Sequence, residues 1–315
     1  MKIFSGSKYQ KLTKEIISNL KSLNHDVELG QLKIDQFSDG EILPLFKESV
    51  RDEDIFFINS TDSSDSILET ILVIDAAKRS GCKSFTLVAP FQGYSRQDKT
   101  DHLRSSIGSK ALAITLESVG LTRLITIDLH SSSIQGFYQI PVIHLNGNKI
   151  FIDHIKKLKL DNVCLVAPDQ GAVKRASDFC KAFPEATFAL INKKRIKPNE
   201  IHSMELVGDV SGKNVIIVDD MTDTGKTLSK AADLLIASNA KSVISVSTHG
   251  ILSGSAIEII NNSKLSKVLV SASLSSTYQK SNLSSKLEVV SCSKLIAKSI
   301  NAISNHLSIN SINSV

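Results

Sequence analysis

Two adjacent carboxylates and a turn rich in threonine and glycine are the residues with the clearest chemical potential in this sequence. Asp219 and Asp220 follow the apolar run 215–218, and residues 222–227 read Thr-Asp-Thr-Gly-Lys-Thr before an amphipathic stretch over 228–240. A helix that begins after such a turn presents unpaired backbone N–H groups, which favour a phosphate dianion. The two acids repel phosphate, but they can accept hydrogen bonds from vicinal hydroxyls or hold a metal. The pattern predicts a sugar-phosphate site, with acids that only cap the turn as the structural alternative.

The same segment ends like the ATP-binding P-loop signature. That signature requires a glycine five residues before its Gly-Lys pair, so that the backbone can approach a phosphate closely. The pair here is Gly225 and Lys226, and the residue five positions earlier is Asp220. An aspartate adds a Cβ and a negative charge at that position, which disfavours a P-loop.

Further polar clusters follow apolar runs elsewhere in the chain. They are Arg96-Gln97-Asp98 after 84–89, Asp128-Leu129-His130 at the end of 123–127, and Asp169-Gln170-Gly171 after 162–167. Ligands of open α/β sheets gather where strands end, at the carboxyl edge, so these clusters are candidate site residues. A lone histidine is more often structural than a ligand, but Asp128 and His130 lie on one side of an extended segment.

A basic group follows the apolar run 187–192. Lys193 and Arg195 are predicted to lie just beyond a strand, in a loop that also contains Pro198 and Asn199. Two cations near a strand end could neutralise the charge of a phosphorylated substrate. A solvated basic run without a ligand is the alternative.

The elements that position these clusters alternate between short apolar runs and longer amphipathic stretches. The predicted strands are 54–60, 84–89, 123–128, 162–167, 187–192, 214–219 and 242–248, and the predicted helices include 66–81, 109–120 and 228–240. Apolar residues recur three and four positions apart in the helices. Nearly continuous apolar strands alternating with such helices are typical of parallel sheets covered on both faces, so an α/β fold is predicted.

An internal repeat points to two similar halves. Residues 87–93 and 165–171 agree in six of seven positions, and each follows a predicted strand. The simplest account is two α/β domains, 1–146 and 147–315, separated near the turn-rich stretch 145–149, with the last helix packing back on the first domain. The Ser- and Asn-rich end, 304–315, is expected to fray.

Composition narrows the class of protein further. The 315 residues are 42% hydrophobic, 22% charged and 5% aromatic, with no Trp, which disfavours disorder and an aromatic platform for nucleic acid. Net charge is +5, but the cations are scattered, so we expect no nucleic-acid partner. The four cysteines are far apart and form no Cys-x-x-Cys pair, as expected of a reducing, cytoplasmic compartment. No apolar stretch reaches the roughly 18 residues of a membrane span.

Several segments together resemble one family. Val-Ile-Ile-Val-Asp-Asp-Met-Thr-Asp-Thr-Gly-Lys-Thr (215–227) is similar to the phosphoribosyl-pyrophosphate loop of phosphoribosyltransferases and of ribose-phosphate pyrophosphokinases. Other segments resemble only the pyrophosphokinases, occur in that family's order and cover almost the whole chain: 37–41, 94–99, 128–145, 167–176, 191–195 and 206–220. The resemblance implies two phosphoribosyltransferase-like α/β domains, each a largely parallel sheet flanked by helices.

The resemblance also implies a reaction. The family makes 5-phosphoribosyl 1-pyrophosphate and AMP from ATP and ribose 5-phosphate, by attack of the ribose C1 hydroxyl on the β-phosphorus of ATP. Such a transfer depends on alignment and on neutralising charge around the migrating group. We therefore expect a Mg²⁺-dependent transferase of nucleotide biosynthesis that forms a homo-oligomer, commonly a hexamer, with no membrane partner.

Matched position by position, the resemblance assigns roles to particular residues. Lys193 and Arg195 are catalytic, and His130 and Asp169 lie around the magnesium-bound nucleotide. The residues implied for ATP are Phe37, Asp39, Gly40, Glu41, Arg96 and Gln97. The residues implied for ribose 5-phosphate are Arg195, Asp219, Asp220, Asp223, Thr224, Gly225, Lys226 and Thr227. Phe37 would stack on the base, with packing in the core as the alternative.

Two departures from the family pattern keep other functions open. Lys226 stands where the family has a second glycine, and Thr222 where an aliphatic residue is usual. A catalytically silent homologue that binds nucleotide and regulates a partner enzyme is one alternative. A phosphoribosyltransferase is another, although it accounts only for the loop at 219–227.

Overall fold

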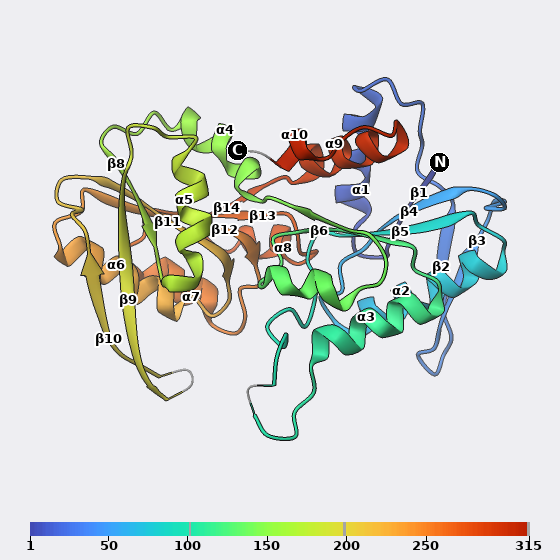
Figure 1. Cartoon of the computed structure of the whole chain (residues 1–315), viewed down its shortest axis with the longest axis horizontal. Coiled ribbons are helices and arrows are strands. Elements are labelled where there is room, and N and C mark those ends of the chain that lie inside the picture. Colours follow the sequence, from blue (N-terminus) through green and yellow to red (C-terminus); the bar gives the residue numbers. More distant parts are fainter. Residues whose placement is uncertain (101, 198–199, 314–315) are drawn as a thin grey trace. The chain divides into compact units, whose positions relative to one another are not determined.

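The chain forms two compact units in a computed structural model, and each unit is an α/β structure (Figure 1). Unit 1 consists of Met1–Asn146 and Cys292–Ser314, and unit 2 consists essentially of Gly147–Ser291. The structure describes residues 1–100, 102–197 and 200–313, without the side chains of 193–197 and 200–203. No helix in these ranges is long and apolar enough to cross a membrane.

Unit 1 is built on a five-stranded parallel sheet with the order β1-β4-β5-β6-β7. Its elements are β1 (Lys2–Ser5), α1 (Gln10–Lys21), β2 (Leu32–Gln36), β3 (Ile42–Phe46), β4 (Asp54–Ile58), α2 (Ser64–Arg79), β5 (Ser84–Ala89), α3 (Gly108–Val119), β6 (Arg123–Ile127), the 3-10 helix η1 (Ser132–Phe137), β7 (Val142–Leu145), α9 (Ser293–Ser304) and α10 (Asn310–Asn313). Strands β2 and β3 form a separate antiparallel hairpin.

Helices cover both faces of the unit 1 sheet. Helices α1 and α9 pack together on one face, and α2 and α3 pack on the other (Figure 1). Phe57 of β4 and Leu87 of β5 are fully buried against the α2–α3 face, together with Val73 and Leu116 of those helices. The strands therefore bury apolar residues on both sides, which explains their nearly continuous hydrophobic sequence.

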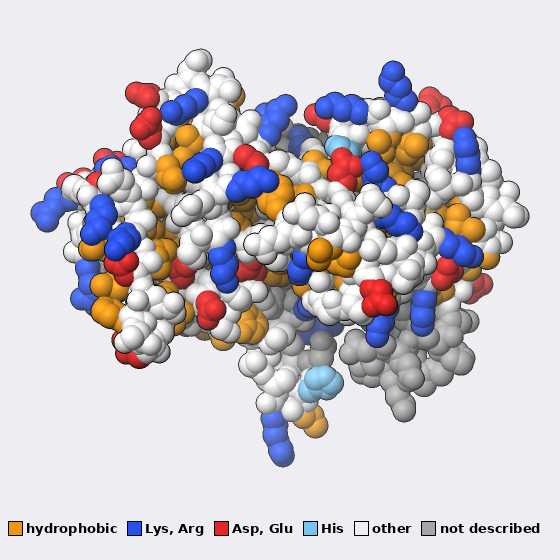
Figure 2. All heavy atoms as spheres, turned by 180° about the vertical axis from the view of Figure 1, so that it is seen from behind, with side chains coloured by type: hydrophobic (Ala, Val, Ile, Leu, Met, Phe, Trp, Pro, Cys, Tyr) orange, Lys and Arg blue, Asp and Glu red, His pale blue; other side chains and the backbone are white. Residues whose placement is uncertain are grey.

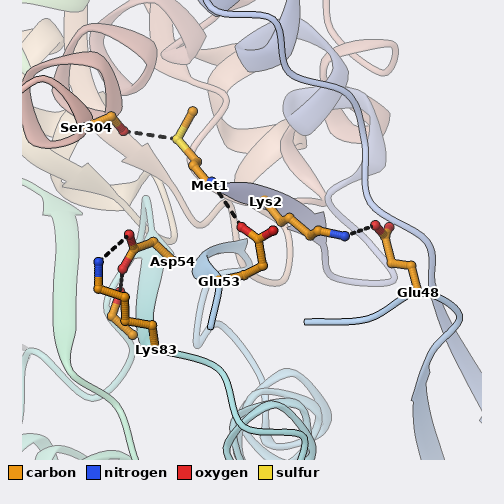
Figure 3. A network of polar contacts seen from close by, with 8 residues as sticks. Met1, Lys2, Glu48, Glu53, Asp54, Lys83 and Ser304 are labelled. Carbon is orange, nitrogen blue, oxygen red and sulfur yellow. Dashed lines mark hydrogen bonds and ion pairs between the residues drawn. The ribbon is translucent and has the colours of Figure 1, made fainter. Parts of the chain in front are cut away.

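Ion pairs secure the edge strand β1 (Figure 3). The Met1 ammonium contacts Glu53 at 3.1 Å, and the Lys2 ammonium contacts Glu48. The Ser304 hydroxyl at the end of α9 donates to the Met1 sulfur at 3.0 Å. These contacts are partly exposed, so each contributes at most about 1 kcal/mol, but together they fix the register of the chain start.

The described end of the chain, up to Asn313, is also held by contacts, so the expectation that this end frays is wrong for residues 304–313. The side chain of Asn313 in α10 accepts from the Asn146 amide at 3.2 Å and donates to the His144 carbonyl at 2.9 Å. Strand β7 lies at the edge of the sheet, so its end has backbone groups without a strand partner. The side-chain amide of Asn313 has the same donor and acceptor as a peptide group, so it satisfies these backbone groups of β7.

Unit 2 is built on a seven-stranded sheet with the order β10-β9-β8-β11-β12-β13-β14. Its elements are α4 (Asn148–Lys157), β8 (Val163–Ala167), the 3-10 helix η2 (Gln170–Ala172), α5 (Val173–Cys180), β9 (Thr187–Lys197), β10 (Glu200–Val207), β11 (Asn214–Thr222), α6 (Lys226–Ala237), β12 (Ser242–Gly250), α7 (Ala256–Asn262), β13 (Lys267–Ser271), α8 (Thr277–Ser281) and β14 (Leu287–Val290). All neighbouring strands are parallel except β9 and β10.

The unit 2 sheet is also covered on both faces. Helix α5 packs against β8 and β11 beside α4, while α6 and α7 pack together on the other face (Figure 1). Alternate residues such as Val166 and Ile217 bury against Ala232 of α6 and Ile260 of α7. On the face drawn in Figure 2, the described Lys and Arg side chains are dispersed among acidic ones.

Candidate active site

The carboxyl ends of two neighbouring strands bring the acidic residues of unit 2 together. Strands β8 and β11 are parallel, with Val166 opposite Ile217, so the segments that follow them lie at the same edge. Asp169 follows β8, and Asp219 and Asp220 lie in the last part of β11. Two of the sequence-predicted clusters are therefore neighbours in space.

The carboxylates influence one another at this edge. Asp220 is buried, Asp219 is half-buried, and the Asp220 amide donates to Asp219 Oδ1 at 2.9 Å. Burial, followed by the negative charges of Asp220 and Asp169, raises the pKa of Asp219 well above its usual value. Charge repulsion of this kind is relieved by a bound cation or by hydroxyl groups that donate to the carboxylates.

The turn after β11 leaves the beginning of α6 open. Gly225 is the N-cap residue with φ +74°, a left-handed conformation that favours glycine, and a glycine has no side chain that could cap the helix. The N-cap residue therefore leaves the N–H groups of the first turn to other partners, as an anion site requires. Thr224 and Lys226 are exposed beside them.

The two residues that depart from the family pattern, Thr222 and Lys226, fit into the turn without disturbing its backbone. The Thr222 hydroxyl is buried and lies 2.7 Å from the hydroxyl of Ser247 on β12, so its polar group is satisfied. Lys226 is the first residue of α6 and its side chain points to the exterior. A Cβ at this position therefore does not fill the turn.

The predicted loop at Lys193 and Arg195 is wrong. Strand β9 continues to Lys197, and β10 pairs with it in an antiparallel hairpin, with Met204 opposite Lys193 and Ile201 opposite Arg195. Backbone pairing extends the strand although the sequence there is polar. Pro198 and Asn199 lie outside the described residues.

The hairpin still carries these residues to the same edge. Strand β9 is parallel to β8, and Ala167, the last residue of β8, lies opposite Leu190. Lys193 and Arg195 therefore follow beyond the carboxyl end of β8, on a hairpin that extends past the neighbouring strands (Figure 1).

In unit 1, the carboxyl ends of β5 and β6 position a second group. The strands are parallel, with Ala89 opposite Thr126, so the segments after them share an edge. Arg96 and Gln97 are exposed there, and the Gln97 carbonyl accepts from the Ser109 amide at the start of α3, at 3.3 Å. His130 is also exposed after β6.

The segment with Phe37 forms the tip of the β2–β3 hairpin. The Phe37 amide donates to the Glu41 carbonyl at 2.8 Å, and Asp39 Oδ1 accepts from the Glu41 amide at 3.1 Å. Gly40 has φ +96°, as such a tight turn requires. Phe37 is 54% exposed, so packing in the core of unit 1 is not its role.

The two predicted metal ligands lie in different units, His130 in unit 1 and Asp169 in unit 2. Within the described part of the chain, no group of three or more His, Cys, Asp or Glu side chains could hold a metal alone. Magnesium prefers oxygen ligands and keeps several waters, so it needs few protein ligands. The repelling carboxylates around Asp219 fit that chemistry.

Comparisons with known proteins decide the family. A family model described as the N-terminal domain of ribose phosphate pyrophosphokinase matches residues 1–120, and one described as the phosphoribosyl synthetase-associated domain matches 184–313. The ribose-phosphate pyrophosphokinase of Porphyromonas gingivalis is 37% identical over 98% of this chain and 96% of its own. That of Aquifex aeolicus is 40% identical over 99% and 98%. The chain belongs to the ribose-phosphate pyrophosphokinase family.

A solved structure of this family agrees with the fold. The crystal structure of phosphoribosylpyrophosphate synthetase from Mycobacterium smegmatis matches with a TM-score of 0.87 and 32% identity, over 97% of this chain and 99% of that one. The predicted α/β fold class and the predicted enzyme class, a diphosphate-transferring kinase of nucleotide biosynthesis, are confirmed by this membership.

Two supporting residues of this pyrophosphokinase family member were missed by sequence reasoning. His144 of β7 accepts the Leu129 amide at Nε2, 2.9 Å away, and so holds the turn that precedes His130. Lys280 of α8 donates to the Ile251 carbonyl, in the segment bonded to the turn at 222–225. The hydrogen-bonded residues are 15 positions apart in the first case and 29 in the second, and the sequence carries no signal for such pairs.

Proposed function

We propose that this chain transfers the β,γ-diphosphoryl group of ATP to the C1 hydroxyl of ribose 5-phosphate, giving 5-phosphoribosyl 1-pyrophosphate and AMP. One observation carries the proposal: a short turn at the carboxyl end of β11 joins Asp219 and Asp220 to the start of α6, whose N-cap is a glycine without a capping side chain. An anion site next to two hydroxyl acceptors is the chemistry that a pentose phosphate needs. Membership of the family gives the reaction class.

The sugar binds through complementary contacts in unit 2. The 5-phosphate accepts hydrogen bonds from the N–H groups of Thr224, Gly225 and the first turn of α6. Thr227 adds a hydroxyl donor, and Lys226 adds a positive charge. The ribose hydroxyls donate to Asp219 and Asp220, and Asp223 completes the turn. Donation by the sugar replaces water at a pair of carboxylates that repel each other, which favours binding.

Transfer forms one bond and breaks one. The ribose O1 attacks the β-phosphorus and its proton passes to solvent, while the bond from that phosphorus to the bridging α,β-oxygen breaks and AMP leaves with the electron pair. Lys193 and Arg195, carried past the carboxyl end of β8, neutralise the charge that develops on the transferred group. Arg195 also contacts the sugar phosphate.

ATP binds through unit 1. Gln97 and the carboxylates Asp39 and Glu41 offer donors and acceptors to the adenine edge, Phe37 stacks on the base beside Gly40, and Arg96 pairs with phosphate. His130 and Asp169 would be the protein groups next to a nucleotide-bound Mg²⁺, and the ion would supply positive charge that neutralises the phosphates.

The chain works as a homo-oligomer, and a hexamer is our specific expectation. Phe37, Leu43 and Leu45 on the β2–β3 hairpin are 40% to 54% exposed, although they are large and apolar. A second copy that covers this hairpin would bury them and would complete the ATP site. Light scattering at micromolar concentration measures the size of the assembly.

The test of the function is a product assay with ATP, ribose 5-phosphate and Mg²⁺, read as AMP and pyrophosphorylated sugar. Lys193→Ala should lower kcat by about a hundredfold to a thousandfold, because removal of one preorganised charge contact costs roughly 3–4 kcal/mol. The matched control is Lys194→Ala on the same strand, which should stay within about twofold. ATP binding without AMP from the wild-type protein would instead identify a silent homologue, and a need for a nucleobase would identify a phosphoribosyltransferase.

A further inference from the structure

A lysine outside the assigned site reaches the segment that borders the sugar-phosphate turn. Lys280 lies in α8, is half-buried, and its ammonium donates to the Ile251 carbonyl oxygen at 2.6 Å. Burial lowers the pKa of Lys280 below its usual value, and the negative charge of Asp223 acts in the opposite direction. The ammonium of Lys280 and the carboxylate of Asp223 therefore attract each other.

The segment that Lys280 holds is bonded directly to the turn. Residues 251–254, which follow β12, are named the strap here. The Leu252 amide donates to the Thr222 carbonyl, and the Ser253 amide donates to the Asp223 carbonyl, each at 3.1 Å. The strap thus fixes the backbone of the two residues that lead into the anion site.

The strap does not adopt this shape by local preference. Leu252 is buried and has φ +53°, a left-handed conformation that costs an ordinary residue about 1–2 kcal/mol. Surrounding contacts have to compensate for that cost. The bond from Lys280 to the preceding carbonyl is charge-assisted, the stronger kind of hydrogen bond, and lies one residue away.

We propose that Lys280 is a positioning residue for ribose 5-phosphate binding, which holds the strap so that the strap in turn holds residues 222 and 223 in their binding conformation. This inference rests on the function proposed above. The ammonium serves the site without touching the sugar, and its positive charge also compensates Asp223 when a phosphate dianion is bound. Loss of the ammonium should therefore weaken sugar-phosphate binding much more than nucleotide binding.

The kinetic test compares Lys280→Met with Lys286→Met. Lys286 is a matched control because it is also half-buried in unit 2 and donates to a carbonyl, that of Ser263, at 2.7 Å. Lys280→Met should raise the KM for ribose 5-phosphate about tenfold, as loss of 1.4 kcal/mol of hydrogen bonding implies, with the KM for ATP within twofold. Lys280→Arg, which keeps the cation, should recover most of the affinity, and Lys286→Met should change neither KM.

Equal changes in both KM values, or an unchanged KM for ribose 5-phosphate, would overturn the proposal. If Lys280→Met fails to fold, Lys280→Gln keeps a donor without the charge, and it should show a smaller rise in the same KM. A Lys280→Gln variant with the wild-type KM for ribose 5-phosphate would contradict the proposed role of the Lys280 positive charge.

Amide hydrogen exchange tests the positioning role independently of activity. Exchange at Leu252 and Ser253 should be about tenfold faster in Lys280→Met than in the wild type or in Lys286→Met, with the same melting temperature. Unchanged exchange would overturn the positioning role even in a fully active enzyme. A wild-type protein that makes no product would refute the proposed function, while the exchange result would still decide the role of Lys280.

Discussion

Two nearly identical segments have different tasks in the two units. Residues 87–93 and 165–171 differ only where Phe91 corresponds to Asp169, and each begins in a parallel strand, β5 or β8. In unit 1 the segment is a buried junction: the Phe91 amide donates to Ser60 at 3.0 Å and the Gly93 amide to Thr61 at 2.7 Å. In unit 2 the segment is largely exposed after Asp169 and forms the helical turn η2.

The difference follows from the one changed residue. Asp169 Oδ1 accepts from the Ala172 amide at 3.2 Å, and this capping bond starts a helical turn. A phenylalanine cannot accept that bond, so the unit 1 segment is held instead by hydroxyls that follow β4. One carboxylate thus turns a packing junction into a solvent-facing turn beside Asp219, and similar sequence alone does not establish similar function.

The strongest way to test this contrast is a pair of glycine substitutions. A Cβ at Gly93 would overlap the Thr61 carbonyl oxygen, whereas a Cβ at Gly171 would meet only Asp169 Oδ1, at 3.3 Å. Gly93→Ala should lower the free energy of unfolding by about 3 kcal/mol, because the backbone has to move apart. Gly171→Ala should stay within about 1 kcal/mol of the wild type. Urea unfolding of both variants gives the numbers, and equal losses would contradict the contrast.

The two glutamines of these segments offer a smaller but sharper test. Gln92 is 2% exposed, donates to the Tyr138 hydroxyl at 2.8 Å, and has a buried Oε1 without a hydrogen-bond partner among the described residues, whereas Gln170 is exposed. Tyr138→Phe should cost about 2 kcal/mol, because it leaves the whole Gln92 amide without a partner. Adding Gln92→Leu to that variant should recover most of the loss, since both polar groups are then gone.

The matching change in unit 2 is the control. Gln170→Leu should alter stability by less than about 0.5 kcal/mol, as exposed substitutions usually do. Thermal unfolding of the single and double variants measures the coupling between Gln92 and Tyr138. A Tyr138→Phe protein as stable as the wild type would show that water already satisfies Gln92.

The sequence was informative wherever burial on both faces of a strand left a continuous apolar run. Strand β5 begins and ends at the predicted residues 84 and 89, and the turn at 222–225 follows a buried strand as expected. Strand β9 was predicted to end at residue 192 because 193–197 is polar. Its extension depends on backbone pairing with β10, and backbone hydrogen bonds leave no hydrophobic pattern.

The contacts that support the candidate site could not be predicted from the sequence. Motifs predict roles for Asp169, Asp219 and the turn up to Thr227, because the chemistry of these residues is local. The strap, Lys280 and His144 act on those motifs through backbone carbonyls and amides. Any residue type can supply a backbone group, so such contacts depend on the fold and not on a recognisable pair of residues.

The smallest expected effect concerns the charge that distinguishes the two segments. The negative charge of Asp169 contributes to the raised pKa of Asp219, after burial and Asp220. A carboxyl with a raised native pKa binds its proton more tightly when folded, so stability falls as pH rises from its ordinary pKa to the raised one. Asp169→Asn removes part of this penalty and keeps an oxygen for the cap.

Without Mg²⁺ and substrates, Asp169→Asn should therefore be more stable than the wild type at pH 7, by about 0.5 kcal/mol, and equal to it near pH 3, where the raised pKa keeps Asp219 protonated. Asp161→Asn, at the other end of β8, should have the opposite sign, because a hydrogen bond from Lys241 lowers the pKa of Asp161. Urea unfolding across this pH range measures both variants. If Asp169→Asn were less stable at pH 7, capping by Asp169 would outweigh its repulsion of Asp219, and the acid would serve the turn more than the site.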